Sequence, residues 1–194
     1  CLMKDPELVK SCLIAIKNVI DIPITVKCRL GLDKYSEEFL DNFISTIVEK
    51  VNDVSYCDHI ILHSRIALMN LDTVKNRSIP PLMYDEVRRI KRKFPKIKIT
   101  INGGFTTKKQ ILDELTNIID IKNNEQLNEE IKNLKIDCVM IGREAYNNPF
   151  MFADFDSFFY NEKNVGLNRE EILIKYAKYC QREYEKFVLP SILL

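Results

Sequence analysis

Two hydrophobic periods alternate along most of the chain. Apolar stripes at helical spacing predict helices, and short runs rich in β-branched residues predict strands. Asp5 followed by Pro6, and Ser36 followed by two glutamates, are typical helix starts. The pattern predicts helices over 5–20, 36–51, 83–94 and 106–115, and strands over 22–30, 59–64, 97–102 and 138–141.

This alternation of strands and helices with short connections predicts an α/β fold with a parallel sheet. Parallel strands need cover on both faces, so the choice is a doubly wound sheet or a (β/α)8 (TIM) barrel. No Gly-x-Gly-x-x-Gly follows any predicted strand, which disfavours a dinucleotide-binding sheet and favours the barrel.

The pattern changes at two places. Residues 117–135 are rich in Asn, Lys, Glu and Ile, and we interpret them as a surface insertion before the last strand. Asn168 and Glu171 have the spacing of a capping box and begin a long helical pattern. No strand follows it, so residues 168–194 are predicted to begin a separate helical domain.

Composition excludes several classes of protein. With 29 Lys+Arg against 28 Asp+Glu, bulk charge does not indicate a nucleic-acid partner. No apolar run is long enough to span a bilayer, so no membrane association is predicted. The six cysteines form no Cys-x-x-Cys pair, which indicates reduced thiols and no metal site. The pattern predicts four of them to be buried: Cys12, Cys28, Cys138 and Cys180.

Polar side chains fall on one face of the predicted strands. Alternation places Lys27, His63 and Asn102 on the interior face of a barrel. A lysine there is costly unless an anion or a ligand meets it, the alternative being a carboxylate pair at the barrel mouth. His63 could also be a hydrogen-bonded core histidine, and we interpret His59, at the other end of its strand, as structural.

Glycines follow the last two predicted strands. Gly103 and Gly104 offer backbone amides without Cβ bulk after Asn102, and Gly142 precedes Arg143, a bidentate phosphate donor. The ends of the last two strands are where TIM barrels build phosphate sites. We therefore predict one anion site from these residues, with an ordinary glycine turn as the alternative.

Taken together, these motifs resemble those of a known family. The chain's motifs are similar, in order and spacing, to those of the tRNA-dihydrouridine synthases, most closely the A-type branch, which acts on uridines of the tRNA D-loop. The resemblance runs from Cys1 to about Phe159, apart from the insertion. The motifs are Cys1-Leu2-Met3, Thr25-Val26-Lys27-Cys28-Arg29, His63-Ser64-Arg65, Asn76-Arg77-Ser78, Asn102-Gly103-Gly104 and Gly142-Arg143 through Pro149.

The resemblance implies the C-terminal half of an FMN-binding TIM barrel, strands five to eight, over residues 1–160. A helical tRNA-binding domain would begin at 168. Lys27 would contact the flavin ring near its N1/O2 edge, and His63 would also contact the cofactor. The FMN phosphate would be held by a group on the last two strand ends: Asn102, Gly103, Gly104, Gly142 and Arg143.

The implied reaction reduces a D-loop uridine to 5,6-dihydrouridine. The base is drawn from its stack, and FMN recharged by NADPH passes a hydride to its C6. The family's cysteine that protonates C5 lies in a Gly-Cys-Pro motif upstream of the segment matching Cys1. We therefore assign no catalytic residue within this chain and expect the piece alone to be inactive.

The resemblance also implies a tRNA contact. Arg77 matches a residue that binds the tRNA backbone, and Lys75, shifted by one position from the family pattern, matches loosely. The basic run 88–98 leads into the opposite end of a strand, so we do not interpret it as an RNA surface. We expect a monomeric full-length protein in the cytoplasm, with an organelle as the alternative, because we expect the N-terminus of the full-length protein to lie upstream of Cys1.

Two other functions stay open at this stage. One is a dihydroorotate-dehydrogenase-like flavoenzyme barrel acting on a free pyrimidine. The other is a tRNA-binding module that has lost catalysis, which a Gly-Cys-Pro motif in the upstream sequence would contradict.

Overall fold

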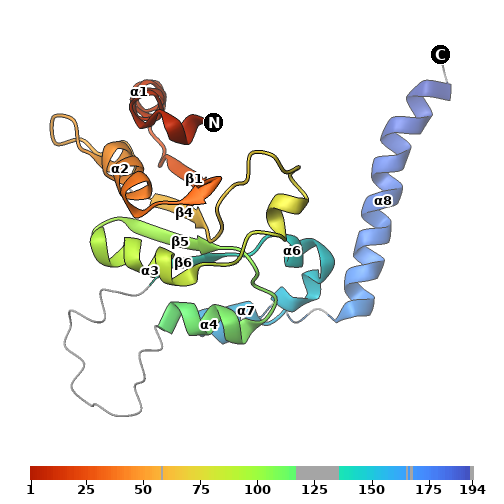
Figure 1. Cartoon of the computed structure of the whole chain (residues 1–194). Helices are drawn as coiled ribbons and strands as arrows, with labels where there is room; N and C mark the ends of the chain where they lie inside the picture. Colours follow the sequence, from red (N-terminus) through yellow and green to blue (C-terminus); the bar gives the residue numbers. More distant parts are fainter. Residues whose placement is uncertain (58, 117–135, 165, 167, 193–194) are drawn as a thin grey trace, which may run out of the picture. The chain divides into compact units, whose positions relative to one another are not determined.

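The computed structural model describes residues 1–57, 59–116, 136–164, 166 and 168–192 (Figure 1). The expected insertion at 117–135 lies outside the described residues. The chain divides into two compact units, Cys1–Gly142 and Arg143–Leu194. The expected boundaries at residues 160 and 168 stay predictions.

The first unit contains a four-stranded parallel sheet, which confirms the predicted α/β class. The strands follow one another across the sheet in chain order, without the reversal that a doubly wound sheet has. Residues that pair between neighbouring strands form rows across the sheet. One such row contains Arg29, His63, Asn102 and Met140. The strands are β1 (Thr25–Arg29), β4 (His59–His63), β5 (Lys98–Asn102) and β6 (Cys138–Met140).

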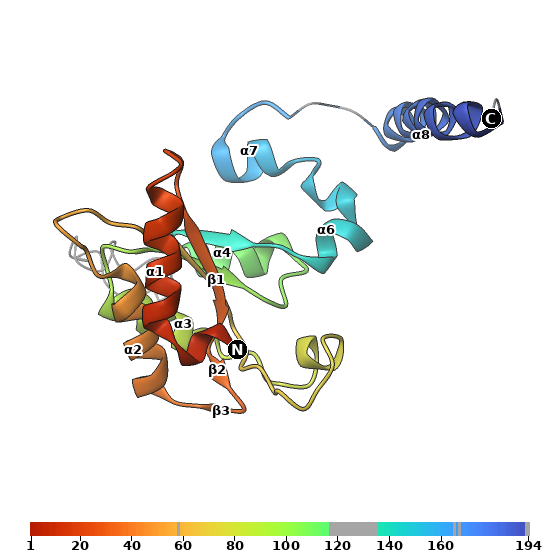
Figure 2. The ribbon, with the colours of Figure 1, turned by 90° about the horizontal axis from the view of Figure 1, so that it is seen from above.

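The two faces of this sheet differ in burial as the alternation predicts. Ile60 and Leu62 of β4 and Ile99 and Ile101 of β5 are fully buried, because their face packs against helices. Lys27 lies on the other face and is exposed. Figures 1 and 2 show α1 and α2 side by side. The helices of this unit are α1 (Pro6–Lys17), α2 (Glu37–Val48), α3 (Tyr84–Lys93) and α4 (Lys108–Thr116).

Local chemistry starts the first two helices where the sequence predicts. The Leu8 amide donates to Asp5 Oδ1 at 3.0 Å, and the Phe39 amide donates to Ser36 Oγ at 3.2 Å. Each bond satisfies an amide that has no partner within its helix, so both predicted caps are confirmed.

The predicted burial of Cys12 on the apolar stripe of α1 is wrong. Leu13 is buried, but Leu8 and Ile16 are exposed, and so is Cys12 beside them. The reason is that α1 packs against α2 along only part of its circumference. Cys180 is also exposed, on a helix of the second unit, and the expected burial of Cys28 and Cys138 is only partial.

A small hairpin after β1 is absent from the sequence prediction. β2 (Gly31–Leu32) and β3 (Lys34–Tyr35) pair antiparallel around Asp33, which has a φ of 58°. The Asp33 amide donates to the Ala67 carbonyl at 2.7 Å, so the hairpin is joined to the loop that follows β4. Four residues in two strands are too few to give a periodic signal.

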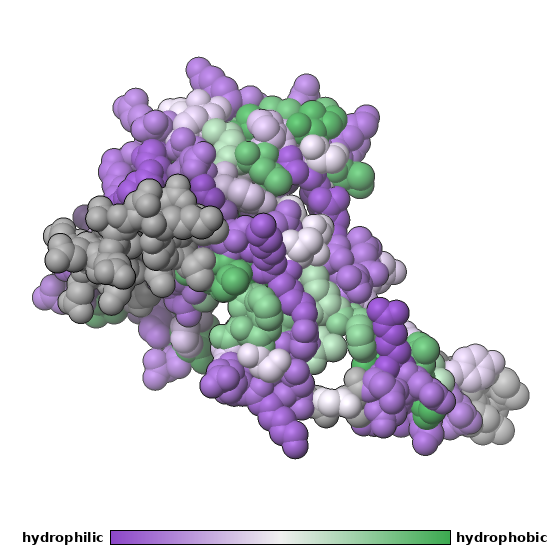
Figure 3. All heavy atoms as spheres, turned by 90° about the horizontal axis from the view of Figure 1, so that it is seen from below, coloured by the Kyte–Doolittle hydropathy of each residue, from purple (hydrophilic) through white to green (hydrophobic). Residues whose placement is uncertain are grey.

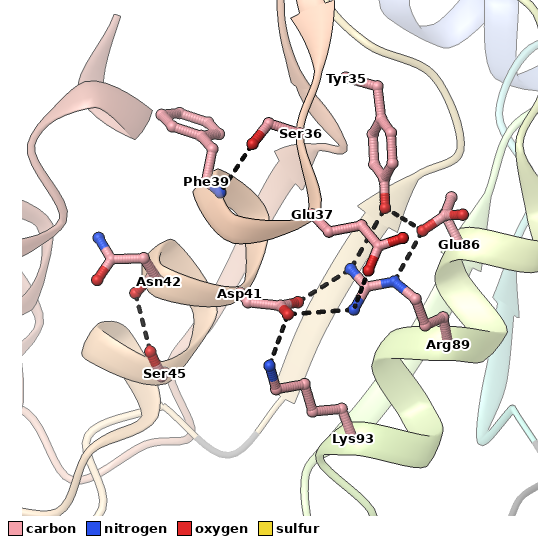
Figure 4. A network of polar contacts seen from close by, with 10 residues as sticks. All are labelled: Tyr35, Ser36, Glu37, Phe39, Asp41, Asn42, Ser45, Glu86, Arg89 and Lys93. Carbon is pink, nitrogen blue, oxygen red and sulfur yellow. Dashed lines mark hydrogen bonds and ion pairs between the residues drawn. The ribbon is translucent and has the colours of Figure 1, made fainter.

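A polar network joins α2 to α3 (Figure 4). The Arg89 guanidinium donates to Asp41 at 2.9 Å and to Glu86 at 2.8 Å, and Lys93 binds the same Asp41 at 2.6 Å. The Tyr35 hydroxyl donates to Glu86. Because Asp41, Glu86 and Arg89 are only partly exposed, their pairs fix the two helices beside each other more firmly than surface pairs do.

The second unit is helical. Its long helix begins with the predicted capping box, since the Glu171 amide donates to Asn168 Oδ1 and the Asn168 amide to Glu171 Oε2, both at 2.9 Å. Its helices are α6 (Arg143–Asn147), the 3-10 helix η4 (Pro149–Phe152), α7 (Phe155–Tyr160) and α8 (Arg169–Ile192). The first unit also contains two short 3-10 helices, η1 (Leu2–Lys4) and η2 (Lys75–Arg77).

Apolar groups also lie at the surface. Figure 3 shows hydrophobic and hydrophilic side chains side by side on one face of the molecule. On α8 the exposed apolar residues include Leu173, Tyr176 and Tyr184. Even so, among the helices that the structure describes, none combines the length and apolar character needed to cross a bilayer.

The buried face of the sheet gives a first prediction. Replacing Ile101 by alanine should lower the free energy of unfolding by about 2–5 kcal/mol, because a fully buried side chain leaves a cavity. Val19→Ala, at a position that is 79% exposed, is the control and should change it by less than about 0.5 kcal/mol. Urea denaturation measures both, and equal effects would contradict the assignment of the buried face.

Candidate functional site at the carboxyl end of the sheet

The carboxyl ends of β1, β4 and β5 bring together the polar residues that the sequence singles out. Lys27 and Arg29 project from one face of β1, and His63 lies beside Arg29 in the pairing of β1 with β4. Asn102 continues the row on β5. Parallel strands placed in register therefore gather side chains from three separate stretches of sequence.

Lys27 is the unpaired cation of this group. In the part of the chain that the structure describes, its ammonium group has no hydrogen-bond or ion-pair partner, so the alternative of a carboxylate pair is not seen there. Partial burial lowers the pKa of Lys27, and the positive charge of Arg29 lowers it further. An anionic ligand would offset both effects.

His63 is held by its neighbour Asn102. His63 Nδ1 and Asn102 Oδ1 are 2.7 Å apart, and Asn102 Nδ2 donates to the Met140 carbonyl at 2.8 Å. His63 Nε2 is buried and has no hydrogen-bond partner among the described residues. A buried nitrogen without a partner is costly, so this atom indicates a place where a ligand donates or accepts a hydrogen bond.

Burial also lowers the pKa of His63 to about 4, and the charges of Arg29, Lys27 and Arg65 act in the same direction, while the Asn102 hydrogen bond opposes them. The imidazole is therefore neutral at pH 7. A substitution of His63 by a side chain that does not titrate should therefore change how the stability of the protein depends on pH.

Gly103 and Gly104 form the turn that the sequence predicts as an anion cradle. Their φ angles are 119° and 78°, which favour glycine. A Cβ on Gly103 would lie 3.6 Å from His63 Nε2, and one on Gly104 would lie 2.6 Å from Leu82 Cδ1 and 2.9 Å from the Tyr84 hydroxyl. The turn thus lies beside the unpartnered nitrogen, and its backbone conformation, together with the overlap at Gly104, disfavours side chains there.

The amides of this turn are available to a ligand. Within the described residues, neither the Gly103 nor the Gly104 amide has an acceptor, whereas the Tyr84 hydroxyl donates to the Gly103 carbonyl at 2.6 Å. The amides that precede α4 already have an acceptor. The amides of Thr106 and Thr107 donate to Gln110 Oε1 at 2.9 and 3.1 Å, so the helix start is already satisfied.

Gly142 and Arg143 follow β6, as predicted. A Cβ on Gly142 would meet no atom within 4 Å, so packing of the protein does not require glycine at this position. Arg143 is exposed and begins α6 in the second unit, and the structure does not define its position relative to Gly103. The predicted convergence of the two strand ends on one anion stays a prediction.

The loop after β4 carries the residues expected to bind RNA. Arg77 and Lys75 are both exposed in η2, and Lys75 lies 3.8 Å from Asp72. Arg29 donates to the Asn76 carbonyl at 2.8 Å and to a second carbonyl of this loop at 3.0 Å. A neighbour of Lys27 on β1 therefore holds the loop in place. Sequence reasoning missed this role of Arg29, which only the fold reveals.

The basic run 88–98 lies elsewhere, and four of its seven cations are paired with carboxylates. Arg88 pairs with Glu114, and the buried Lys91 lies 2.9 Å from Asp137. Arg89 and Lys93 belong to the network with Asp41 described above. Pairing of these four cations agrees with the structural interpretation of the run.

The described residues contain no group of three or more His, Cys, Asp or Glu side chains able to hold a metal ion. The groups gathered at this edge are a cation, a histidine nitrogen and glycine amides, which suit an anionic ligand that also forms hydrogen bonds.

Two glycines allow a matched test of the turn. Gly104→Ala should destabilise the protein by about 1–3 kcal/mol, because the new Cβ overlaps Leu82 and the φ angle is strained. Gly142→Ala should leave stability within about 0.5 kcal/mol of wild type, since its Cβ enters open space. Urea denaturation compares them, and a destabilised Gly142→Ala variant would show that the described surroundings of Gly142 are wrong.

The lowered pKa of His63 gives a pH prediction. The unfolded state binds a proton near pH 6.5 and the folded state only near pH 4, so stability contributed by neutral His63 is complete above pH 6.5 and is lost as the pH falls between these values. Denaturation of wild type and His63→Gln should show a smaller loss of stability over this window in the variant. Parallel curves would contradict the assignment.

Comparison with known proteins identifies the family. Residues 1–189 match the family model described as "Dihydrouridine synthase (Dus)". Among curated proteins, the chain is 39% identical over 183 residues to a tRNA-dihydrouridine(20/20a) synthase of Shewanella oneidensis, covering 93% of this chain and 48% of the relative. A protein of the same name from Vibrio cholerae is 37% identical over 185 residues, covering 94% of this chain and 50% of the relative.

The chain thus spans about half the length of the curated relatives it matches. The family match extends past β6 and covers most of α8, so it includes both units. The resemblance found in the sequence motifs is confirmed: the chain belongs to the dihydrouridine synthase family.

Proposed function

We propose that this chain is part of an FMN-dependent tRNA-dihydrouridine synthase, which uses NADPH to reduce a D-loop uridine. The observation that carries the proposal is the buried His63 Nε2 next to the amides of Gly103 and Gly104, none of which has a hydrogen-bond partner among the residues that the structure describes. Lys27 supplies an unpaired cation at the same sheet edge. Together these groups match a ligand that combines an anionic tail with polar ring atoms.

We further propose that the first unit belongs to the second half of a TIM barrel, its strands being the fifth to eighth. The sequential strand order supports this, as do the two edge strands β1 and β6, each with one neighbour in the described sheet. The exposed apolar residues of α1 are a surface that further barrel elements would cover.

The described residues fit FMN in chemical type. The amides of Gly103 and Gly104 would bind the phosphate, and Gly142 with Arg143 would add to this site from the end of β6. Lys27 would place positive charge against the flavin ring. When bound, FMN supplies the hydride-transfer chemistry, while the protein orients it and stabilises its negative charge.

The family's proton donor is proposed to lie upstream of Cys1. Cys28 does not suit that role, since it occupies the helix-facing side of β1 and burial raises its pKa to about 12. The chain's residues thus bind and orient, and the acid comes from the other part of the full-length protein.

For the RNA, we propose that Arg77 and Lys75 contact the tRNA backbone. Both lie in the loop that Arg29 holds at the carboxyl end of the sheet, where a substrate of the site would enter. The names of the relatives favour tRNA over a free pyrimidine, which is the substrate of the alternative dihydroorotate-dehydrogenase-like enzyme.

The full-length protein tests this function directly. It should purify with a flavin absorption spectrum and form dihydrouridine in unmodified tRNA when NADPH is supplied. Activity on a free pyrimidine instead of tRNA would favour the alternative enzyme, and tRNA binding without reduction would favour a module without catalysis. A protein that ignores added FMN would contradict the proposal.

A variant of Lys27 tests its proposed contact with the flavin. Lys27→Met in the full-length protein should lower the affinity for FMN or the rate of its reduction by roughly tenfold to a hundredfold, the effect of losing a hydrogen bond to a charged group. Lys98→Met is the matched control, because Lys98 is an exposed lysine at the opposite end of β5. Flavin fluorescence and stopped-flow absorbance measure the two quantities; equal behaviour of the variants would exclude a role for Lys27.

A further inference from the structure

The hydrogen bonds around Asn102 determine which nitrogen of His63 carries the proton. Asn102 Nδ2 donates to the Met140 carbonyl at 2.8 Å, and a carbonyl can only accept. The amide oxygen of Asn102 therefore faces His63 Nδ1, 2.7 Å away. Since that oxygen also only accepts, Nδ1 must be the donor.

The other nitrogen of the ring consequently has a free lone pair. In the neutral imidazole with a proton on Nδ1, Nε2 is an acceptor. Nε2 is buried and has no donor among the described residues, and it lies next to Gly103, whose Cβ position would be 3.6 Å from it. Three cations, Lys27 and Arg29 of β1 and Arg65 after β4, disfavour a second proton on the ring.

We propose that His63 accepts a hydrogen bond from a hydroxyl or N–H group of the bound cofactor, and that Asn102 is the positioning residue that fixes this tautomer. The inference rests on the proposed function, because it specifies how His63 recognises FMN. The ribityl hydroxyls and the ring N–H are the donors that FMN offers. A phosphate oxygen, which only accepts at neutral pH, does not pair with this nitrogen.

The same bonds define the role of Asn102. Its side-chain oxygen and nitrogen are both used within the protein, and the residue is 7% exposed. Asn102 therefore acts on the cofactor through His63, and the phosphate depends on the amides of Gly103 and Gly104. This differs from the family-based expectation that Asn102 itself holds the phosphate.

The first test measures the tautomer in the full-length protein. Histidines labelled with 15N, with His63 assigned through the His63→Gln spectrum, should show Nδ1 protonated and Nε2 unprotonated at pH 7, both with and without FMN. A protonated Nε2 in the FMN complex would overturn the inference.

The second test measures FMN affinity by fluorescence between pH 5.5 and 8. With Nε2 as acceptor, the His63 contribution should be constant over this range, so the ratio of dissociation constants between His63→Gln and wild type should not change. That ratio should be about threefold to tenfold, the effect of one neutral hydrogen bond. A ratio that grows as the pH falls would show a protonated His63 donating to phosphate, and would overturn the inference.

His59→Gln is the matched control. His59 lies on the same face of the same strand at its other end, with Nε2 2.6 Å from Thr100 Oγ1. This variant should bind FMN as wild type does, whereas equal losses in both variants would assign the effect to the fold.

Asn102→Asp tests the positioning role. A carboxylate beside Nδ1 favours the doubly protonated ring, which turns Nε2 into a donor, so His63 should titrate at higher pH and FMN affinity should fall as His63 becomes charged. A His63 titration unchanged in a folded Asn102→Asp protein would contradict that role. If the wild-type protein binds FMN at no pH, the proposed function is overturned together with the inference. If FMN binds but Nε2 carries a proton, only the inference fails.

Discussion

The site depends on the in-register pairing of four parallel strands. This pairing places Arg29, His63, Asn102 and Met140 in one row, although they are separated by more than a hundred residues of sequence. The row is then locked by hydrogen bonds that run from the Met140 carbonyl through Asn102 to His63. A shift of one strand by one residue would move its polar side chains to the helix-facing side and its apolar ones to the site.

The two ends of the sheet differ in whether their cations are paired with carboxylates. Beyond the amino ends, the buried Lys91 pairs with Asp137, and Arg89 and Lys93 are neutralised by acidic residues of α2 and α3. At the carboxyl ends, Lys27 lacks such a partner among the described residues. The nearly equal totals of positive and negative residues in the chain, 29 and 28, therefore hide a local imbalance, and the proposed binding of an anionic cofactor and of RNA depends on it.

Much of the fold and of the site could be predicted from the sequence, because both depend on local periodicity. The caps at Asp5 and Ser36, the alternation along β4 and β5, and the glycine turn at 103–104 are each encoded within a few residues. The role of Arg29 in holding the loop, the satisfied start of α4 and the exposure of Cys12 could not be predicted, since each depends on which distant segment lies opposite. Sequence reasoning placed Asn102 at the site, but its two hydrogen-bond partners come from other strands.

A crystal structure of the full-length protein with bound FMN tests the central claim most directly. The account predicts the FMN phosphate within hydrogen-bond distance of the Gly103 and Gly104 amides, with the flavin ring extending toward Lys27. FMN bound away from the carboxyl ends of β1, β4 and β5, or a Lys27 side chain directed away from the ring, would contradict it.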